Sequence, residues 1–408
     1  MVRLEKFPAD FVLFNEGDDG DFCYLIKEGK VGIIKDEKII NTIGKGDYLG
    51  ERAIIFSEKR AATAKTIEES EFWLINRDDF LQLLDKDLEI YLRKKILLQD
   101  VTIKLTDIEI LEEISKNAYS RTHLVCNKHN GMIYALKSIE KSVADIAKLE
   151  TNLENDKIIH KKACFPFIST LVRTFTDTKY YYLLYEHIPG PSLEILISEN
   201  TCFSMKDTRF YASIILLILE YLHSENIIHR AISSQLFYID EYGYPILTSF
   251  INSKIIESRT YSIVGFPYYM APEVINGSGY SFSSDLWSFG ILIYEMLYGS
   301  YPFGNGDEDP YKIYEKIVKG NVKYPVFIKE SMKPKGIIEF LLQKDPLLRG
   351  SAEDLKAHAW FEGVPWEDLL ARHVKPDFIP EIIDIDVSKS TNLKDILDTV
   401  EDEIIVDP

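Results

Sequence analysis

The chain has 408 residues, of which 47 are lysine or arginine and 65 are aspartate or glutamate, giving a net charge of −18. The length predicts two or three domains, and the 46% share of hydrophobic residues is enough to give each a core. So large an acid excess repels phosphate backbones and anionic bilayers, so we expect neither a nucleic-acid partner nor binding to a membrane surface.

Cysteine usage and hydropathy narrow the class of protein further. The four cysteines show no CxxC pair and no ligand-like spacing to histidine, which argues against a disulfide framework or a metal site. The longest apolar run, 214–222, is interrupted by Glu220 and is too short to span a bilayer. No basic-then-apolar leader opens the sequence. We therefore predict an intracellular, cytoplasmic protein without a membrane span.

The first part of the sequence has the pattern of a small β domain. Residues 11–75 hold short apolar runs separated by turns rich in glycine and aspartate, such as 16–21 (EGDDGD) and 44–47 (GKGD). This punctuation favours a β-barrel or jelly roll. Over 77–101, apolar residues recur every three or four positions after an Asp-rich start, which predicts one long amphipathic helix.

The remainder changes from strand-like to helical patterns. β-like runs occupy 105–188 around a charged helical stretch, and 193–361 is mainly helical in pattern. We therefore predict a strand-rich lobe followed by a larger helical lobe. The final segment, 381–408, holds nine acids and two lysines, and it is predicted to be a solvated, flexible extension.

A first candidate site lies at 48–63. Gly50 and Glu51 precede a predicted helical turn, and Arg60 follows Glu51 by nine residues. Amides at the start of a helix attract a phosphate, a carboxylate accepts ribose hydroxyls, and a guanidinium pairs with two phosphate oxygens. The segment therefore predicts a pocket for a sugar phosphate.

This segment closely resembles the phosphate-binding cassette of cyclic-nucleotide-binding domains, and the resemblance covers about residues 5–100. It implies that Glu51 holds the ribose 2′-hydroxyl, that Arg60 holds the cyclic phosphate, and that Gly50 and Ala53 supply the cassette backbone. The alternative is a domain of this fold that no longer binds a ligand.

The resemblance also bears on the choice of base. In this family a hydroxyl residue directly after the arginine favours cGMP, whereas alanine suits cAMP, and the residue here is Ala61. One hydrogen bond is worth roughly tenfold in affinity or less. The implied ligand is cAMP or cGMP, with cAMP bound at least as tightly as cGMP.

Several short motifs follow one another in the second part of the chain: YALK (134–137), YLHS (221–224), IIHR (227–230), MAPE (270–273), DLWSFG (285–290) and AHAWFEG (357–363). With these motifs in this order, residues 108–361 resemble a protein kinase of the AGC group, most closely the cyclic-nucleotide-dependent kinases. The resemblance implies an ion pair between Glu273 and Arg349.

The two resemblances together imply a multidomain α+β protein, a cyclic-nucleotide-binding β jelly roll followed by a bilobal protein-kinase-like fold. The expected parts are a jelly roll with its closing helix at 1–100, a strand-rich lobe at 105–190, a helical lobe at 191–365, and an AGC-type tail with an acidic end at 366–408.

The catalytic positions of the kinase family are altered. Its His-Arg-Asp motif reads His229-Arg230-Ala231, its metal-binding asparagine is Leu236, and its Asp-Phe-Gly motif begins with Ser249. Phosphoryl transfer needs a carboxylate at the substrate hydroxyl and two metal ligands. Alanine and leucine cannot serve, and a neutral serine hydroxyl is a poor ligand for Mg²⁺. We therefore expect no intact catalytic site and no metal site.

The ATP pocket is altered as well. Ser115, Asn117 and Ser120 stand at the three glycine positions of the phosphate-binding loop, where side chains hinder close approach to phosphates. Tyr185 aligns with the residue at the back of the pocket that is known as the gatekeeper. These changes argue against the binding of ATP and Mg²⁺.

Two further positions of the family can be located. Lys137 is the retained lysine, and its partner acid is Asp156 in an ungapped alignment or Glu154 after a two-residue shift. Ser262 aligns with the activation-loop phosphosite, and Arg230 is the residue that would bind its phosphate. The alternative is an ordinary loop serine beside a structural arginine.

Three functions follow as hypotheses. The leading one is a regulatory or scaffolding protein in which cyclic nucleotide binding is coupled to a pseudokinase that binds a protein partner through its lobes. The second is an active or weakly active cyclic-nucleotide-dependent serine/threonine kinase. The third is a structural component of a cytoskeletal or ciliary assembly.

Overall fold

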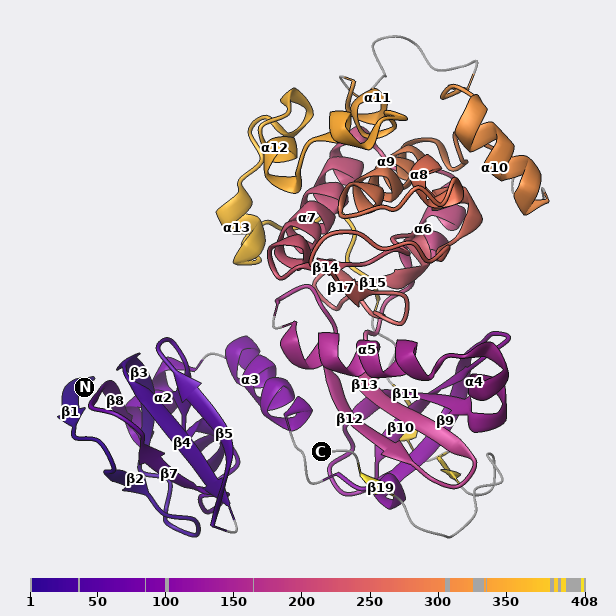
Figure 1. The fold of residues 1–408 in the computed structure, drawn as a ribbon. Helices are drawn as coiled ribbons and strands as arrows, with labels where there is room; N and C mark the ends of the chain where they lie inside the picture. The colour runs from indigo at the N-terminus through magenta and orange to yellow at the C-terminus, as the bar shows by residue number, and fades with distance from the viewer. Residues whose placement is uncertain are drawn as a thin grey trace. The chain divides into compact units, whose positions relative to one another are not determined.

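The computed structural model describes residues 2–35, 37–84, 86–99, 103–163, 165–304, 309–325, 334, 336–381, 385–387, 390–393 and 405–406. The chain divides into two compact units, Met1–Thr102 and Ile103–Pro408 (Figure 1), which are described separately. No helix in these described ranges is long and apolar enough to cross a bilayer.

The first unit contains two antiparallel four-stranded sheets, with strand orders β1-β8-β3-β6 and β2-β7-β4-β5. The strands are β1 (Arg3–Phe7), β2 (Val12–Phe14), β3 (Phe22–Glu28), β4 (Lys30–Lys35), β5 (Lys38–Gly44), β6 (Tyr48–Leu49), β7 (Thr63–Thr66) and β8 (Ser70–Asn76). Side chains from both sheets, including Ile26, Val31 and Phe72, meet in one buried cluster. The predicted jelly roll is confirmed.

Three helices complete this unit: α1 (Glu51–Ile55), α2 (Arg77–Leu83) and α3 (Lys86–Leu98). The single helix predicted over 77–101 is wrong, because α2 ends at an extended Leu84. Asn76 caps α2, its side chain accepting a hydrogen bond from the amide of Asp79 at 2.8 Å. Residues 85–87 hold two aspartates, a composition typical of a helix start. The apolar spacing continues across them, so periodicity alone predicts one helix in place of two.

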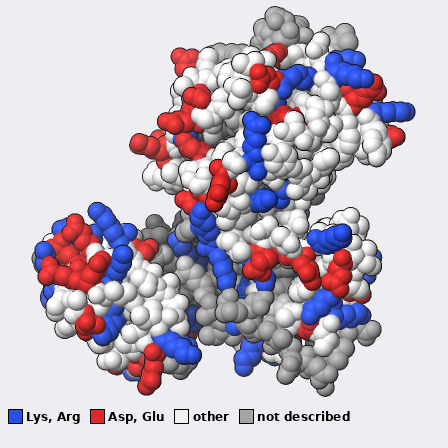
Figure 2. Space-filling view, viewed as in Figure 1, with Lys and Arg blue, Asp and Glu red and all other residues white. Residues whose placement is uncertain are grey.

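The acid excess is unevenly distributed on the visible surface. Figure 2 shows acidic side chains grouped on the first unit over the part where β1 and β3 lie. Where the second unit is visible in Figure 2, its acidic and basic side chains are interspersed.

The second unit begins with a strand-rich lobe. Its five main strands are β9 (Ile108–Lys116), β10 (Arg121–Asn127), β11 (Ile133–Glu140), β12 (Leu171–Thr176) and β13 (Tyr180–Glu186). They pair antiparallel in the order β9-β10-β11-β13-β12. Helices α4 (Lys141–Ala147) and α5 (Glu150–Lys162) follow β11, and α5 lies between the sheet and the helical lobe (Figure 1).

The C-terminal segment extends this sheet at both edges. β18 (Thr391–Asn392) pairs with β9, and β19 (Ile405–Val406) pairs with β12. These residues were predicted to belong to a flexible, solvated extension, and at these two places that prediction is wrong. The acid-rich composition of the segment did not reveal these two short strands, Thr-Asn and Ile-Val, that add to the sheet edges.

The helical lobe packs around α7 (Met205–Ser224) and α9 (Ser283–Tyr298), which are largely buried. Its other helices are α6 (Leu193–Asn200), α8 (Pro272–Ile275), α10 (Pro310–Lys319), α11 (Ile337–Leu341), α12 (Ala352–Lys356) and α13 (Trp366–Leu370). Two small antiparallel pairs join β14 (Ile227–Ile228) to β17 (Lys254–Ile255) and β15 (Phe237–Ile239) to β16 (Pro245–Leu247). The predicted bilobal fold is confirmed.

A buried ion pair stabilises this lobe. Arg349, fully buried, donates from Nη1 and Nη2 to the two carboxylate oxygens of Glu273 at 2.6 and 2.8 Å. Such a bidentate pair is geometrically specific, and removing one partner would leave an uncompensated buried charge. The geometry agrees with the ion pair implied by the sequence.

Candidate functional sites

The 48–63 segment brings a glycine and an arginine into direct contact. Gly50 precedes α1 with a φ of 91°, a left-handed conformation that glycine adopts without strain. A Cβ at this position would lie 2.4 Å from Nη1 of Arg60 and 3.0 Å from the carbonyl oxygen of Phe22. Glycine is required here because the guanidinium lies directly against the backbone.

Two carbonyl groups orient the Arg60 side chain. Nη1 donates to the carbonyl of Gly50 at 2.6 Å, and Nη2 donates to the carbonyl of Phe22 at 2.7 Å. The guanidinium also lies 4.2 Å from the centre of the Phe14 ring, and the residue is only 5% exposed. Its Nε is buried without a hydrogen-bond partner. Arginine has five N–H groups, so this oriented fork retains donors for an anion.

Glu51 supplies an unpaired acceptor in the same segment. It is the first residue of α1, and its Oε2 is buried without a hydrogen-bond partner. Burial raises the pKa of Glu51, although Arg60 acts in the opposite direction. Ala53 is buried on α1, whereas Ala61 is exposed. An unpaired acceptor and an unpaired donor therefore lie in one cassette, which suits a ligand carrying both hydroxyl and phosphate groups.

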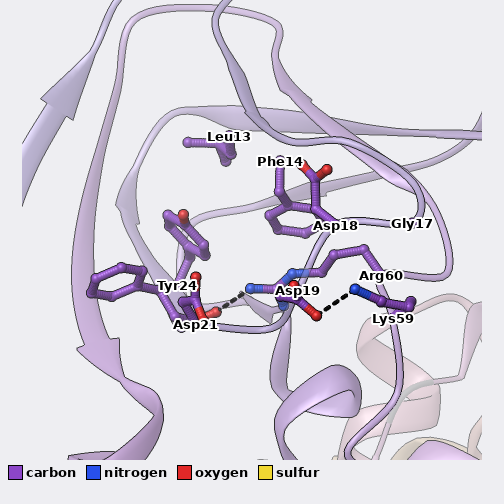
Figure 3. A pocket seen from close by; sticks show the side chains of 10 residues that line it. Leu13, Phe14, Gly17, Asp18, Asp19, Asp21, Tyr24, Lys59 and Arg60 are labelled. Atoms are coloured by element: carbon purple, nitrogen blue, oxygen red, sulfur yellow. Dashed lines mark hydrogen bonds and ion pairs between the residues drawn. The ribbon is translucent and has the colours of Figure 1, made fainter.

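A cavity of about 440 Å³ lies beside Arg60 (Figure 3). It is lined by Leu13, Phe14, Gly17, Asp18, Asp19, Asp21, Phe22, Tyr24, Lys59 and Arg60. Of the five predicted ligand-binding residues, only Arg60 is among them. Lys59 is already paired with Asp19 at 2.5 Å. The composition of 16–21 predicts only a turn, but its three aspartates also line this cavity.

In the second unit, the loop before Ala231 is rigidly held. The carboxylate of Asp285 accepts from the amides of His229 and Arg230 at 2.9 and 2.8 Å, and His223 lies 3.0 Å from the same carboxylate. Burial raises the pKa of Asp285, but His223 and His229 outweigh this effect and lower it. The scaffold that positions a catalytic residue is therefore present.

The side chains that follow His229 and Arg230 differ from those that the resemblance to kinases implies. Ala231 is buried and ends in a methyl group, and Leu236 packs against the main hydrophobic core. The carbonyl of Ser249 lies 2.9 Å from Nε2 of His229. Within the described ranges, no group of three or more His, Cys, Asp or Glu residues is arranged to hold a metal ion.

The loop between β9 and β10 is closed by one of its own side chains. Oδ1 of Asn117 accepts from the amides of Tyr119 and Ser120 at 2.9 and 2.8 Å, and the hydroxyl of Ser120 lies at 3.2 Å. The Asn117 amide donates to the carbonyl of Ser120 at 3.0 Å. An asparagine oxygen thus occupies amides that a glycine loop would offer to phosphates. The sequence predicts only a steric effect of Asn117, whereas the structure adds these hydrogen bonds.

Asp156 is the acid that faces the retained lysine. It is fully buried, whereas Glu154 is exposed and pairs with Lys157 at 3.6 Å. Asp156 attracts Lys137 electrostatically, but Lys137 makes no ion pair or hydrogen bond with the described part of the chain. Burial lowers the pKa of Lys137, and Asp156 only partly offsets this.

Tyr280 connects Ser262, in the predicted activation segment, to Arg230. Ser262 is exposed, and its carbonyl accepts from the hydroxyl of Tyr280 at 2.5 Å. Tyr280 also interacts with Arg230, whose Nε donates to the carbonyl of Asn252 at 2.5 Å. The arginine is thus engaged with backbone and with Tyr280.

Comparison with known families agrees with this architecture. The cyclic nucleotide-binding domain matches residues 4–87, and the protein kinase domain matches residues 108–361. The chain belongs to the protein kinase family. Its kinase domain therefore occupies most of the second unit, and the predicted combination of a cyclic nucleotide-binding domain with a kinase domain is confirmed.

The relatives include kinases that are named as cGMP-dependent and one that is named as cAMP-dependent. The chain is 33% identical to a cGMP-dependent protein kinase of Plasmodium berghei, over 92% of this chain and 45% of that protein. It is 29% identical to human cGMP-dependent protein kinase 2, over 91% of this chain and 55% of that protein. It is 35% identical to yeast cAMP-dependent protein kinase type 3, over 68% of this chain and 70% of that protein. The chain thus spans about half the length of the cGMP-dependent relatives.

Proposed function

We propose that this protein binds a cyclic nucleotide through its first domain and carries a kinase domain that does not transfer phosphate and instead binds protein partners. The observation that carries the proposal is Ala231, which stands where the kinase family has its catalytic aspartate, directly after the His229 and Arg230 amides that Asp285 holds. General acid–base assistance is worth roughly 10²–10⁴ in rate.

The ligand of the first domain is proposed to be cAMP or cGMP. The unpaired Nε of Arg60 and the unpaired Oε2 of Glu51 support a ligand with a phosphate and a ribose hydroxyl. Ala61 supports cAMP, whereas the cGMP-dependent relatives support cGMP. We therefore propose that both bind, with cAMP at least as tight.

We propose that the kinase domain does not bind ATP, because three of its residues are unsuited to the phosphates or the metal. The Asn117 side chain occupies loop amides, Leu236 offers no metal ligand, and Ser249 offers only a neutral hydroxyl where the family has a carboxylate. A nucleoside triphosphate entering this site would have to displace the side chain of Asn117 from the loop amides. Its Mg²⁺ would also lack the carboxylate ligand that the kinase family supplies.

The second candidate is an active cyclic-nucleotide-dependent serine/threonine kinase. The comparisons favour it, since the reported relatives are all named as protein kinases. The retained Lys137 and the ordered loop around His229 also support it. The first proposal rests instead on the chemistry of the substituted side chains.

Thermal shift measurements with cAMP, cGMP and Mg-ATP separate the two candidates. The first proposal predicts a rise in melting temperature with either cyclic nucleotide and none with Mg-ATP, because only binding to the folded state stabilises it. A Mg-dependent shift with ATP, followed by phosphate transfer to a general peptide substrate, would support the second candidate.

A further inference from the structure

The strongest feature that the proposed function leaves unused is a set of polar contacts around Asp156 on α5. Its Oδ2 accepts a hydrogen bond from the hydroxyl of Tyr185 on β13. Its Oδ1 accepts from the amide of Phe250 at 2.7 Å, in the segment that replaces the metal-binding motif of the family. One fully buried carboxylate therefore connects the sheet of the strand-rich lobe to the helical lobe.

Other contacts reinforce the same connection. Nδ2 of Asn152, one helical turn before Asp156, donates to the carbonyl of Ile251 at 2.8 Å. The ring of Phe250 lies 4.7 Å from that of His160 on α5 and 5.7 Å from that of His229 in the catalytic loop, measured between ring centres. Polar and aromatic contacts therefore join α5 to the segment around Phe250.

We propose that Tyr185, Asp156 and the Phe250 amide form a latch that holds the two lobes of the kinase domain together without a nucleotide. Asp156 attracts Lys137 but makes no ion pair with it in the described part of the chain, and the two latch contacts are what hold its carboxylate oxygens. With this latch, side chains of the domain itself hold the two lobes closed. The domain therefore presents the same surface with and without ATP.

Burial makes the hydrogen bonds of Asp156 important for stability. A fully buried carboxylate is costly unless its oxygens are hydrogen-bonded, and hydrogen bonds to charged groups are stronger than neutral ones. Removing the Tyr185 hydroxyl leaves Oδ2 without its donor, and the carboxylate is then free to turn toward Lys137. The bond between Oδ1 and the Phe250 amide weakens as a result, because the same rigid group makes both contacts.

The chain offers a matched control on the same strand. The hydroxyl of Tyr182 donates to Oδ2 of Asp177 at 2.8 Å, and Tyr182 is fully buried. This is also a buried tyrosine–aspartate pair on β13, but Asp177 belongs to the β12–β13 turn, within one lobe. Tyr182→Phe and Tyr185→Phe therefore remove the same kind of bond, and only one of them belongs to the latch.

The test is hydrogen exchange in protein free of nucleotide, followed by mass spectrometry of peptides that contain α5 and residues 249–253. Tyr185→Phe should speed exchange of the Phe250 amide roughly tenfold, the effect of one lost hydrogen bond. Tyr182→Phe should leave that amide unchanged. Equal exchange in Tyr185→Phe and the wild type, or the same acceleration in both variants, would overturn the latch.

A second measurement separates the latch from the question of ATP binding. Mg-ATP added to the wild-type protein should add no protection to α5 or to residues 249–253. Added protection would contradict closure without nucleotide, even where Tyr185→Phe behaves as expected. Because the variant comparison contains no nucleotide, failure of the proposed function would leave its result unaffected.

Discussion

Arg60 and Gly50 are bound to each other through the backbone: Nη1 of the arginine donates to the glycine carbonyl at 2.6 Å, and only a residue without a Cβ leaves room for the guanidinium. The contact fixes the arginine before any ligand arrives, so little side-chain entropy remains to be lost on binding. The orientation of Arg60 is therefore set by the backbone of its own domain.

Arg60→Lys should weaken cyclic nucleotide binding by roughly 10- to 100-fold, because a lysine cannot provide the oriented fork of donors. The measurement is calorimetric titration with cAMP and cGMP. Lys59→Ala is the matched control, since Lys59 lines the same cavity but is exposed and paired with Asp19. Arg60→Lys keeps the positive charge and changes only the donor geometry, so equal losses in the two variants would contradict a specific role for the Arg60 fork.

Ala61→Thr should raise cGMP affinity by up to roughly tenfold and leave cAMP affinity nearly unchanged, because the new hydroxyl offers a partner to the guanine amino group. Ala61 is exposed, so the substitution should not disturb the core. Competition between the two nucleotides on wild type and variant measures the ratio. A wild-type protein already strongly selective for cGMP would contradict this account.

Asp156 should make the stability of the kinase domain depend on pH in the acid range. Burial alone raises the pKa of Asp156, but His160, Lys137 and Tyr185 lower it to about 2, below the ordinary 3.8. Such a carboxyl adds stability that is complete above the unfolded pKa and is lost as pH falls toward the folded one. The stability lost between about pH 5 and pH 2 should be about 2 kcal/mol.

Urea unfolding at successive pH values tests this dependence. Asp156→Asn should flatten the acid limb of the stability curve, since its amide does not titrate. Glu154→Gln is the control, because Glu154 is exposed on the same helix. If both variants keep the wild-type acid limb, Asp156 is not the group responsible.

Ser262 is proposed as a phosphorylation site. A phosphate there would lie near Tyr280 and Arg230, and the arginine could exchange its bond to the Asn252 carbonyl for a charge-assisted pair. Phosphate mapping of protein purified from its native cells should find Ser262 modified, and Arg230→Ala should remove any stabilisation that results. An unmodified Ser262 would dispose of the proposal.

Much of the fold was predictable because its signals are local in the sequence. Turns such as 44–47 separate the strands, and ordered motifs such as 285–290 indicate the second fold. The identity of residue 231 could also be read directly, since a missing carboxylate needs no geometry. The cassette residues followed from their spacing within 48–63.

The rest depended on contacts between distant residues. Tyr185 and Asp156 are 29 positions apart, and Phe250 is 94 positions from Asp156, so no periodicity relates them. The sequence left Asp156 and Glu154 as equal candidates, and burial distinguishes them. The hydrogen bonds of Asn117 were missed because the position was treated as a lost glycine and not as a new acceptor.

The central claim is that the protein binds cyclic nucleotide and does not transfer phosphate. The most direct test measures transfer of labelled γ-phosphate from Mg-ATP to a general basic peptide, with saturating cAMP or cGMP, by wild type and by Lys137→Met. We predict no difference between the two proteins. Transfer by the wild type that is lost in Lys137→Met would contradict the claim and identify an active kinase.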